Sequence, residues 1–264
     1  AKTQYETSGY TADYDSVITT SSTSIGSGGN WSDEWAYEET DAVSALDYYK
    51  SKIKPNINIA ILDSGINYNH ELFKNRVVHT HTDFSTDASD DEMDKYGHGT
   101  NVAGAIAKST PSNVRLSCYK IHNQNGEGTS ATALAAFEYI KQLSNKPDII
   151  NCSFATRSGL GIVVDELVDM GITVVAGAGN EGKEVYQQPA IFDSAITVAA
   201  TNRYGSAWSS SNYGPCVDIA APGDYVYTAD MSSNTAYEFA SGTSLATPLV
   251  SAAAAYVLME NRKY

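Results

Sequence analysis

Short apolar runs alternate with helical patterns along most of the chain. The runs have the length of buried strands and cover residues 57–62, 114–121, 148–152, 172–176, 195–199 and 217–220. Helical spacing occurs at residues 97–108, 129–143 and 159–170, and also at residues 41–52 and 243–261. Because nearly continuous apolar strands alternate with helices, we predict an α/β fold whose parallel sheet is covered on both faces.

Three segments add detail to this pattern. Residues 1–30 are rich in Ser, Thr, Gly and Tyr, a composition typical of an arm or linker that lies over a domain. Residues 243–261 predict a long apolar helix, which we expect to be buried on most sides. In the helix predicted at residues 41–52, Asp41 is suited to be the N-terminal cap.

Composition and charge narrow the functional classes. The chain has 264 residues, 42% of them hydrophobic, which suits one domain with a large core. Its net charge of −14 argues against nucleic-acid binding, which needs clustered Lys and Arg. No apolar run has the roughly 18 residues of a membrane span. Three cysteines do not make a disulfide framework, and we expect Cys118 and Cys152 to be buried thiols.

Four polar residues stand at places where the functional side chains of a parallel sheet gather. Asp63 ends the strand predicted at 57–62, and Asn180 lies in a Gly-rich turn after the strand at 172–176. His98 stands between two glycines at a helix start, and Ser244 opens the last helix. Each has an ordinary structural explanation by itself. Together they supply an orienting acid, an oxyanion donor, a base and a nucleophile.

The segments around these residues resemble the signature blocks of subtilisin-like serine peptidases. The order Asp, His, Ser along the chain is also the subtilisin order. The resemblance covers residues 31–260 and implies three layers, helix/sheet/helix, around a mainly parallel central sheet. Residues 31–264 would then form the peptidase domain and residues 1–30 its N-terminal arm. The matching blocks are Asp63-Ser64-Gly65, Gly97-His98-Gly99-Thr100, Ala178-Gly179-Asn180-Glu181-Gly182 and Gly242-Thr243-Ser244-Leu245-Ala246-Thr247-Pro248.

The resemblance implies a serine endopeptidase that works through an acyl-enzyme. Asp63 would hold the imidazole of His98, which would act as general base and then as general acid. Ser244 would attack the scissile carbonyl, and Asn180 would bind the oxyanion together with the Ser244 N–H. The family is typically secreted, which implies an extracellular or cell-surface location, and it is normally made with an inhibitory pro-segment.

A peptide or protein substrate would bind as an extended strand added to the edges of the cleft. The resemblance places one edge at residues 125–128 and the other at residues 153–155. It places the primary specificity pocket between residues 153–155 and residues 177–179. A bulky Phe154 would narrow this pocket or move its wall. The implied substrate-binding residues are Gly126, Glu127, Gly128, Ser153, Phe154, Ala155, Gly177, Ala178 and Gly179.

The sequence departs from the family pattern in several places. Only residues 108–113 separate the helix that begins near His98 from the next strand, so a loop that often binds a structural calcium ion is missing. Asn101 stands where a second histidine is common and is not expected to join the triad. The chain ends 20 residues after Ser244, so we expect a domain that is short at its C-terminus.

The loop at residues 83–94 is strongly acidic. Our first interpretation is a solvated loop, and the alternative is a weak calcium site. Apart from that site, no metal or other cofactor is expected. A third interpretation is an attraction for basic peptides, which Glu127 and Glu181 beside the cleft would strengthen. The acidic residues are Asp83, Asp87, Asp90, Asp91, Glu92 and Asp94.

Two other functions compete with an active peptidase. One is a catalytically idle peptide-binding or regulatory domain on the same scaffold, which usually lacks a triad residue, whereas all three are present here. The other is a lipase or esterase, which would show Gly-x-Ser-x-Gly and the order Ser, acid, His. Ser244 lies in Gly-Thr-Ser-Leu-Ala and comes last. The sequence leaves open whether a peptidase would degrade proteins broadly or mature one precursor.

Overall fold

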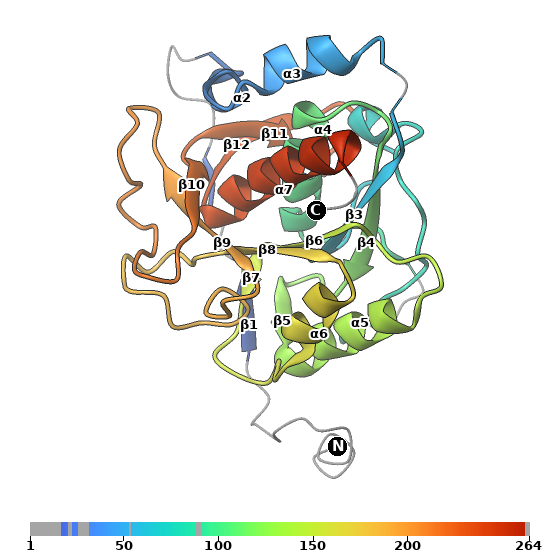
Figure 1. Cartoon of the computed structure of the whole chain (residues 1–264), viewed down its shortest axis with the longest axis vertical. Coiled ribbons are helices and arrows are strands. Elements are labelled where there is room, and N and C mark those ends of the chain that lie inside the picture. The colour runs from blue at the N-terminus through green and yellow to red at the C-terminus, as the bar shows by residue number, and fades with distance from the viewer. Residues whose placement is uncertain (1–16, 21–22, 26–31, 53, 88–90, 262–264) are drawn as a thin grey trace.

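A six-stranded parallel sheet forms the centre of the molecule (Figure 1). The computed structural model describes residues 17–20, 23–25, 32–52, 54–87 and 91–261. The strand order is β10-β9-β8-β6-β3-β4, and every neighbouring pair is parallel, as the apolar runs predicted. The strands are β3 (Ile57–Asp63), β4 (Val114–Lys120), β6 (Ile149–Cys152), β8 (Thr173–Gly177), β9 (Ile196–Thr201) and β10 (Ile219–Pro222).

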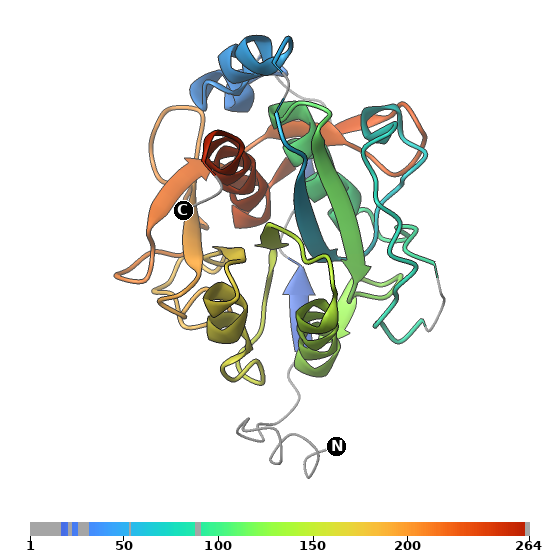
Figure 2. The ribbon, with the colours of Figure 1, turned by 45° about the vertical axis from the view of Figure 1, so that its right-hand side comes forward.

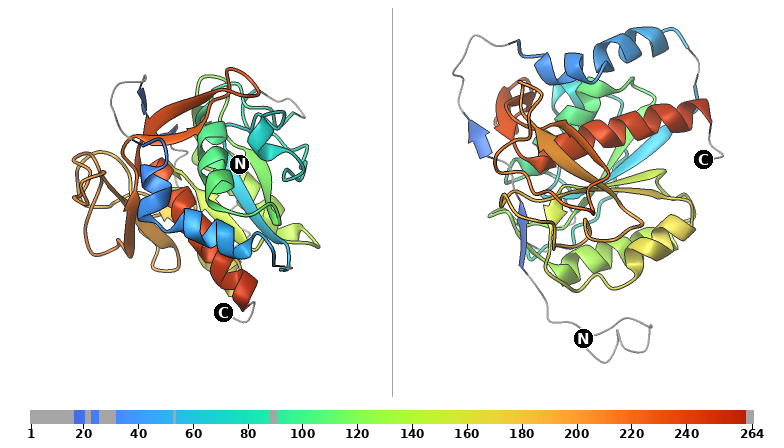
Figure 3. Two further views of the ribbon diagram at one scale, coloured as in Figure 1. Left: turned by 90° about the horizontal axis from the view of Figure 1, so that it is seen from above. Right: turned by 60° about the vertical axis from the view of Figure 1, so that its left-hand side comes forward.

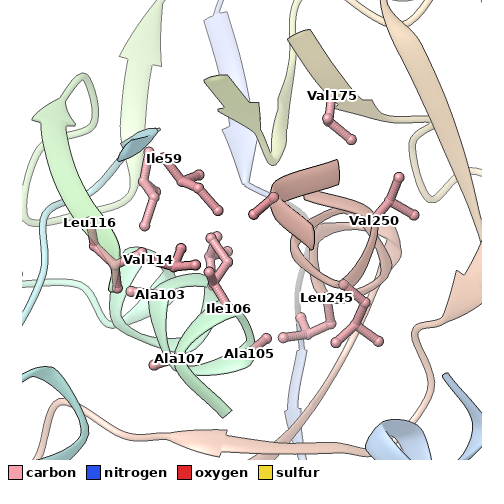
Figure 4. Packing of buried hydrophobic residues seen from close by; sticks show 14 of the residues in the cluster. Ile59, Ala103, Ala105, Ile106, Ala107, Val114, Leu116, Val175, Leu245 and Val250 are labelled. Atoms are coloured by element: carbon pink, nitrogen blue, oxygen red, sulfur yellow. The ribbon is translucent and has the colours of Figure 1, made fainter. Parts of the chain in front are cut away.

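Helices cover both faces of this sheet, which confirms the three-layer prediction (Figures 1 and 2). α4 (His98–Ser109) and α7 (Thr243–Glu260) lie on one face, and α5 (Ser130–Gln142) and α6 (Val163–Asp169) lie on the other. The side chains of a strand alternate between faces, so β3 contributes to two cores. Ile59 and Ile61 pack with α4 and α7, while Leu62 packs with α5 and α6. Figure 4 shows the first core, with side chains from β3, α4 and α7 directed at one another.

Two short helices lie over the α4 and α7 layer (Figure 3, right). They are α2 (Trp35–Glu39) and α3 (Ala42–Tyr49), and a 3-10 turn, η1 (Glu71–Phe73), follows β3. The helix predicted at 41–52 is therefore present, but the capping role of Asp41 is wrong. Asp41 has a left-handed backbone with φ of 54°, and its side chain makes no capping hydrogen bond.

One predicted helix is much shorter than its apolar pattern suggests. The pattern covers residues 159–170, whereas α6 begins at Val163. Gly159 and Gly161 have φ values of 99° and 57°, which belong to the left-handed region and cannot continue a right-handed helix. The segment before Val163 therefore forms a turn rather than a first helical turn.

Two small antiparallel sheets accompany the central sheet, and neither was predicted. The first has the order β5-β1-β7 and joins β1 (Val17–Thr20), β5 (Glu127–Thr129) and β7 (Phe154–Ala155). The second has the order β11-β12-β2 and joins β2 (Thr23–Ile25), β11 (Val226–Ala229) and β12 (Tyr237–Ser241). Both β1 and β2 belong to the segment interpreted as an arm, and both pair with strands of the domain.

Cys118 and Cys152 are buried thiols, as expected, and Cys216 is partly exposed; all three are free. In the described part of the chain, no helix combines the length and the apolar character needed to cross a bilayer.

Candidate active site

Asp63 and His98 form a buried hydrogen-bonded pair at the end of β3. The imidazole Nδ1 lies 2.7 Å from Oδ1 and 2.9 Å from Oδ2 of the carboxylate. Asp63 is completely buried, and His98 is 3% exposed. The Nδ1 position therefore carries the proton that Asp63 accepts, which leaves Nε2 as the basic nitrogen of the ring.

Glycines allow the helix that carries His98 to approach β3 closely. A Cβ atom on Gly99 would lie 2.1 Å from the carbonyl oxygen of Gly65, so no larger residue fits there. Gly97 precedes α4 with a φ of 114°, which favours glycine and turns the chain so that His98 is the first helical residue. These contacts explain why the His98 ring lies beside the last residue of β3.

Asp94 organises the N-terminus of α4, a role that the sequence did not reveal. Its Oδ1 accepts hydrogen bonds from the N–H of Gly97 at 2.8 Å and from the Ser64 hydroxyl at 3.0 Å. Its Oδ2 accepts from both the N–H and the hydroxyl of Thr100. Ser64 in turn accepts the N–H of Gly99. The carboxylate thus satisfies N–H groups that a helix start leaves without partners, and it fixes the turn that presents His98.

Ser244 lies in the first turn of α7 and is 1% exposed. Pro248, one helical turn later, has no N–H and cannot donate to the Ser244 carbonyl. The Ser153 hydroxyl donates to that carbonyl instead, at 3.0 Å. Asn151 donates to the Ser153 hydroxyl and accepts from Ser251, which ties β6 to α7. In the sequence, the only hint of this network was that Asn151 is a polar residue within an apolar strand.

The structure does not form a hydrogen bond between Ser244 and His98. The Ser244 hydroxyl donates to the carbonyl oxygen of Ser153 at 3.2 Å. Among the described residues, Nε2 of His98 is buried without a hydrogen-bond partner. Asp63 and His98 of the predicted triad are thus paired, while the Ser244 hydroxyl is turned toward Ser153.

Asn180 follows β8 and lies against the start of α7. Its Oδ1 accepts the N–H of Thr243 at 2.9 Å, which sets the orientation of the side-chain amide. The neighbouring Gly179 has a φ of 102°, and its N–H donates to the Thr243 hydroxyl. The Gly-rich turn therefore fixes Asn180 beside the residue that precedes Ser244.

A second imidazole lies near Asp63. His122 is completely buried just after β4, and its Nδ1 is 3.9 Å from Oδ1 of Asp63, beyond hydrogen-bonding distance. Burial lowers the pKa of His122 to about 4, so this ring is neutral at pH 7. Burial by itself would raise the pKa of Asp63, but the charge and hydrogen bond of His98, with a smaller effect from His122, lower it below its usual value. Asp63 is therefore ionised and can stabilise an imidazolium.

The two predicted edges of the cleft are β5 and β7, and β1 lies between them (Figures 1 and 2). Ile18 stands opposite Gly128, Thr19 opposite both Glu127 and Ala155, and Thr20 opposite Phe154. Both pairings are antiparallel. The chain's own segment thus occupies the position that the sequence assigned to an extended substrate.

The residues predicted to line the primary specificity pocket lie in β7 and at or just after the end of β8. A Cβ atom on Gly177 would lie 3.0 Å from the Thr247 hydroxyl, so the end of β8 packs directly on α7. Ala178 is completely buried. Phe154 is 2% exposed and packs against Phe137 and His122 in the second core. Its ring contributes to the core, and its backbone forms the edge that pairs with Thr20.

The interpretation of residues 83–94 as a solvated loop is wrong for much of its length. The Asp83 side chain is buried 3.4 Å from Lys120, and Glu92 and Asp94 are buried and hydrogen-bonded. Asp90 lies outside the described residues. Within the described part of the chain, no group of three or more His, Cys, Asp or Glu side chains is arranged to hold a metal ion.

The family model of the subtilase family matches residues 54–264. The chain belongs to the subtilase family.

Relatives in the subtilase family include an extracellular serine proteinase of Thermus sp. (strain Rt41A). It is 35% identical over an alignment of 208 residues, which covers 76% of this chain and 50% of the relative. Another is subtilisin-like protease 1 of Pseudogymnoascus destructans, 33% identical over 76% of this chain and 51% of the relative. A solved structure of a cold-adapted subtilisin-like serine proteinase is also similar, with a TM-score of 0.73 and 32% sequence identity. The match covers 78% of this chain and 77% of the chain in that structure. This chain spans about half the length of the curated relatives it matches.

Proposed function

We propose that this subtilase is a serine endopeptidase with Asp63, His98 and Ser244 as its catalytic triad. The observation that carries the proposal is the buried Asp63–His98 pair, whose imidazole keeps Nε2 without a hydrogen-bond partner among the described residues. A buried nitrogen without a hydrogen-bond partner costs free energy, and a catalytic role is one explanation for keeping such a group; here the role would be to accept the proton of a serine. Residues 31–264 are proposed as the peptidase domain.

In the proposed mechanism, the Ser244 hydroxyl first leaves the carbonyl of Ser153 and donates to Nε2 of His98. We propose that rotation about the Cα–Cβ bond of Ser244 makes this change. Nε2 then takes the proton as Oγ attacks the scissile carbonyl, and the ionised Asp63 stabilises the imidazolium through Nδ1–H. His98 returns the proton to the leaving amine, which leaves an acyl group on Ser244. Water, activated by His98, releases the acid product.

The oxyanion would be bound by the amide NH2 group of Asn180 and the N–H of Ser244. The Oδ1 of Asn180 accepts from Thr243, so the other end of that amide is the donor. Ser244 is in the first turn of α7, where the helix dipole favours negative charge. Together these two donors would stabilise the tetrahedral intermediate more than the planar substrate.

The substrate would be a peptide or protein that adds a strand between β5 and β7. The position of β1 supports this mode, because an extended segment already makes both antiparallel pairings there. We also propose that β1 acts as an inhibitory pro-segment, since it and a substrate cannot occupy the same place. The chemistry requires no cofactor. An extracellular or cell-surface location is proposed from the name of the Thermus relative.

Substitution of Ser244 by Ala tests the catalytic proposal. We expect peptide hydrolysis to fall by about 10⁶-fold, which is the size of the loss that the comparable change causes in subtilisin. Labelling by a fluorophosphonate should also be lost in Ser244→Ala and in His98→Ala, with unchanged thermal unfolding. Wild-type protein that binds peptides but neither cleaves them nor takes the label would support an idle binding domain instead.

Substitution of Ile18 by Pro tests the inhibitory role of β1. Proline removes a main-chain donor from a strand that has a neighbour on each side, so it should loosen β1 from β5 and β7. We expect the full chain to cleave a short chromogenic peptide several times faster, about three- to tenfold, and to react faster with a fluorophosphonate. Ile18→Ala keeps the N–H and serves as the control. Equal rates for wild type and Ile18→Pro would contradict the inhibitory role.

A further inference from the structure

A polar cavity adjoins His98. Its volume is about 290 Å³, and it lies between the turn before α4 and the hairpin formed by β11 and β12. It is lined by Tyr96, Gly97, His98, Asn101, Asp230, Met231, Ser232 and Glu238. Because His98 lines it, a group in this cavity would lie next to the reacting atoms.

The cavity carries negative charge without a matching cation. Glu238 and Asp230 both line it, and no Lys or Arg does. Within the described residues, neither carboxylate forms an ion pair. Glu238 accepts from the side-chain amide of Asn101 at 2.9 Å, and Asp230 accepts from the N–H and hydroxyl of Ser232. Burial is the main effect that raises the pKa of Glu238; the hydrogen bond from Asn101 lowers it, and the charge of Asp230 adds a smaller increase.

A second, independent observation shows that peptide backbone binds beside this cavity. β2 runs antiparallel along β12, with Ile25 opposite Phe239 and Thr23 opposite Ser241. Glu238 directly precedes Phe239 in β12. β1 pairs with β5 and β7, and β2, the next strand along the chain, pairs with β12. Consider a substrate that pairs with β5 and β7 before its scissile bond and runs in the same chain direction as β1 and β2. Its residues after that bond would lie along β12.

We propose that this cavity is a subsite for a lysine or arginine side chain on the C-terminal side of the scissile bond. Glu238 and Asp230 are its specificity-determining residues. A cationic side chain that enters beside His98 meets two carboxylates that have no cationic partner among the described residues, one of them half-buried, where charge interactions are stronger than at an open surface. The assignment rests on the proposed peptidase function, since it names the substrate class of that same cleft.

The test uses pairs of internally quenched peptides that differ at one position, lysine against norleucine, at each of the first four positions after the scissile bond. Both peptides of a pair compete in one reaction of the full chain, so the ratio of their kcat/KM values does not depend on how much enzyme is active. We expect at least one position to favour lysine about tenfold, and this preference to weaken as salt is added.

Glu238→Gln should reduce that preference to about twofold or less. Glutamine keeps an oxygen for Asn101 and removes only the charge. Glu71→Gln is the matched control, because Glu71 contacts β12 through the Tyr237 hydroxyl but does not line the cavity. It should leave the lysine preference unchanged.

Two results would overturn the inference while leaving the peptidase proposal standing: peptide hydrolysis with no lysine preference at any of the four positions, or a preference that Glu238→Gln does not alter. If no peptide is cleaved, the peptidase proposal fails, and the subsite is tested by binding. The Ser244→Ala chain should then bind a fluorescein-labelled lysine peptide about tenfold more tightly than its norleucine partner. Equal affinities would overturn the subsite.

Discussion

Two acid–histidine pairs lie close to each other in sequence but do different work. In one, His98 Nδ1 binds Asp63, and both side chains are buried. In the other, His79 Nδ1 binds Glu92, which is 2% exposed, while the side chain of His79 is 45% exposed. Both pairs join a buried carboxylate to an imidazole. The pairing by itself therefore does not identify a catalytic site.

The difference lies in the other partners of each carboxylate and each ring. Glu92 also accepts from the N–H groups of Thr80 and His81 and from the Thr80 hydroxyl, so it fixes the backbone of a loop. The basic nitrogen of His98 instead is buried without a hydrogen-bond partner among the described residues, and in the proposed mechanism it accepts the proton of Ser244. A catalytic pair needs an acceptor nitrogen aimed at a nucleophile and donors for the charge that develops.

The strongest test of this contrast is Asp63→Asn. The neutral amide can no longer stabilise the imidazolium and favours the wrong tautomer of His98. We expect kcat/KM to fall by roughly 10⁴-fold, the size found for comparable changes in other serine proteases. Peptide hydrolysis measures the loss, and thermal unfolding checks the fold. Activity within tenfold of wild type would place the acid of the site elsewhere.

His122 sharpens the contrast, because it lies near the same carboxylate without pairing to it. Its folded-state pKa is about 4, below the ordinary 6.5, so between these values the unfolded chain binds more protons. Stability therefore rises with pH through this window, and the full cost of about 3 kcal/mol is present below pH 4. His122→Leu removes the titrating group. The free energy of unfolding in urea is measured with and without His122→Leu on a Ser244→Ala background. As the pH falls from 6.5 to 4, the variant should gain about 3 kcal/mol of stability relative to the chain that keeps His122. A stability difference that stays constant over this range would contradict the assignment.

Glu92→Gln should show the opposite pattern from Asp63→Asn. Glutamine leaves some of the N–H and hydroxyl donors of the loop poorly matched, so we expect the free energy of unfolding to fall by about 2 kcal/mol. The kcat/KM of the folded protein should stay within about twofold, since Glu92 has no contact with His98 or Ser244. Denaturant unfolding and a peptide assay measure the two effects. A large loss of activity without a loss of stability would mean that the second pair also serves catalysis.

Much of the fold could be predicted because the central sheet is built from local patterns. The parallel strands are rich in apolar residues, and β3 is recognisable together with the acid that ends it. The antiparallel strands were missed for the opposite reason. β7 has only two residues, and β1 pairs with segments more than one hundred residues away, so no local pattern marks either of them.

The acidic loop shows the same limit at the level of single residues. Asp91 and Asp94 are alike in sequence, but Asp91 is exposed while Asp94 is buried under five hydrogen bonds from Ser64, Tyr96, Gly97 and Thr100. Composition predicted a solvated loop because it counts charges without their partners. Asp94 gains these partners only because α4 packs against the turn after β3 in the folded chain.

The sequence alone determined the family, the order of the layers and the identity of the four candidate catalytic residues. It could do so because glycines and polar groups at strand ends and helix starts are required locally by backbone geometry and chemistry. Tertiary structure decided that β1 lies between β5 and β7, that the Ser244 hydroxyl is turned toward Ser153, and that Asp230 and Glu238 line one cavity beside His98. These features depend on contacts between distant segments, whose free energies are set by burial and pairing in the folded chain.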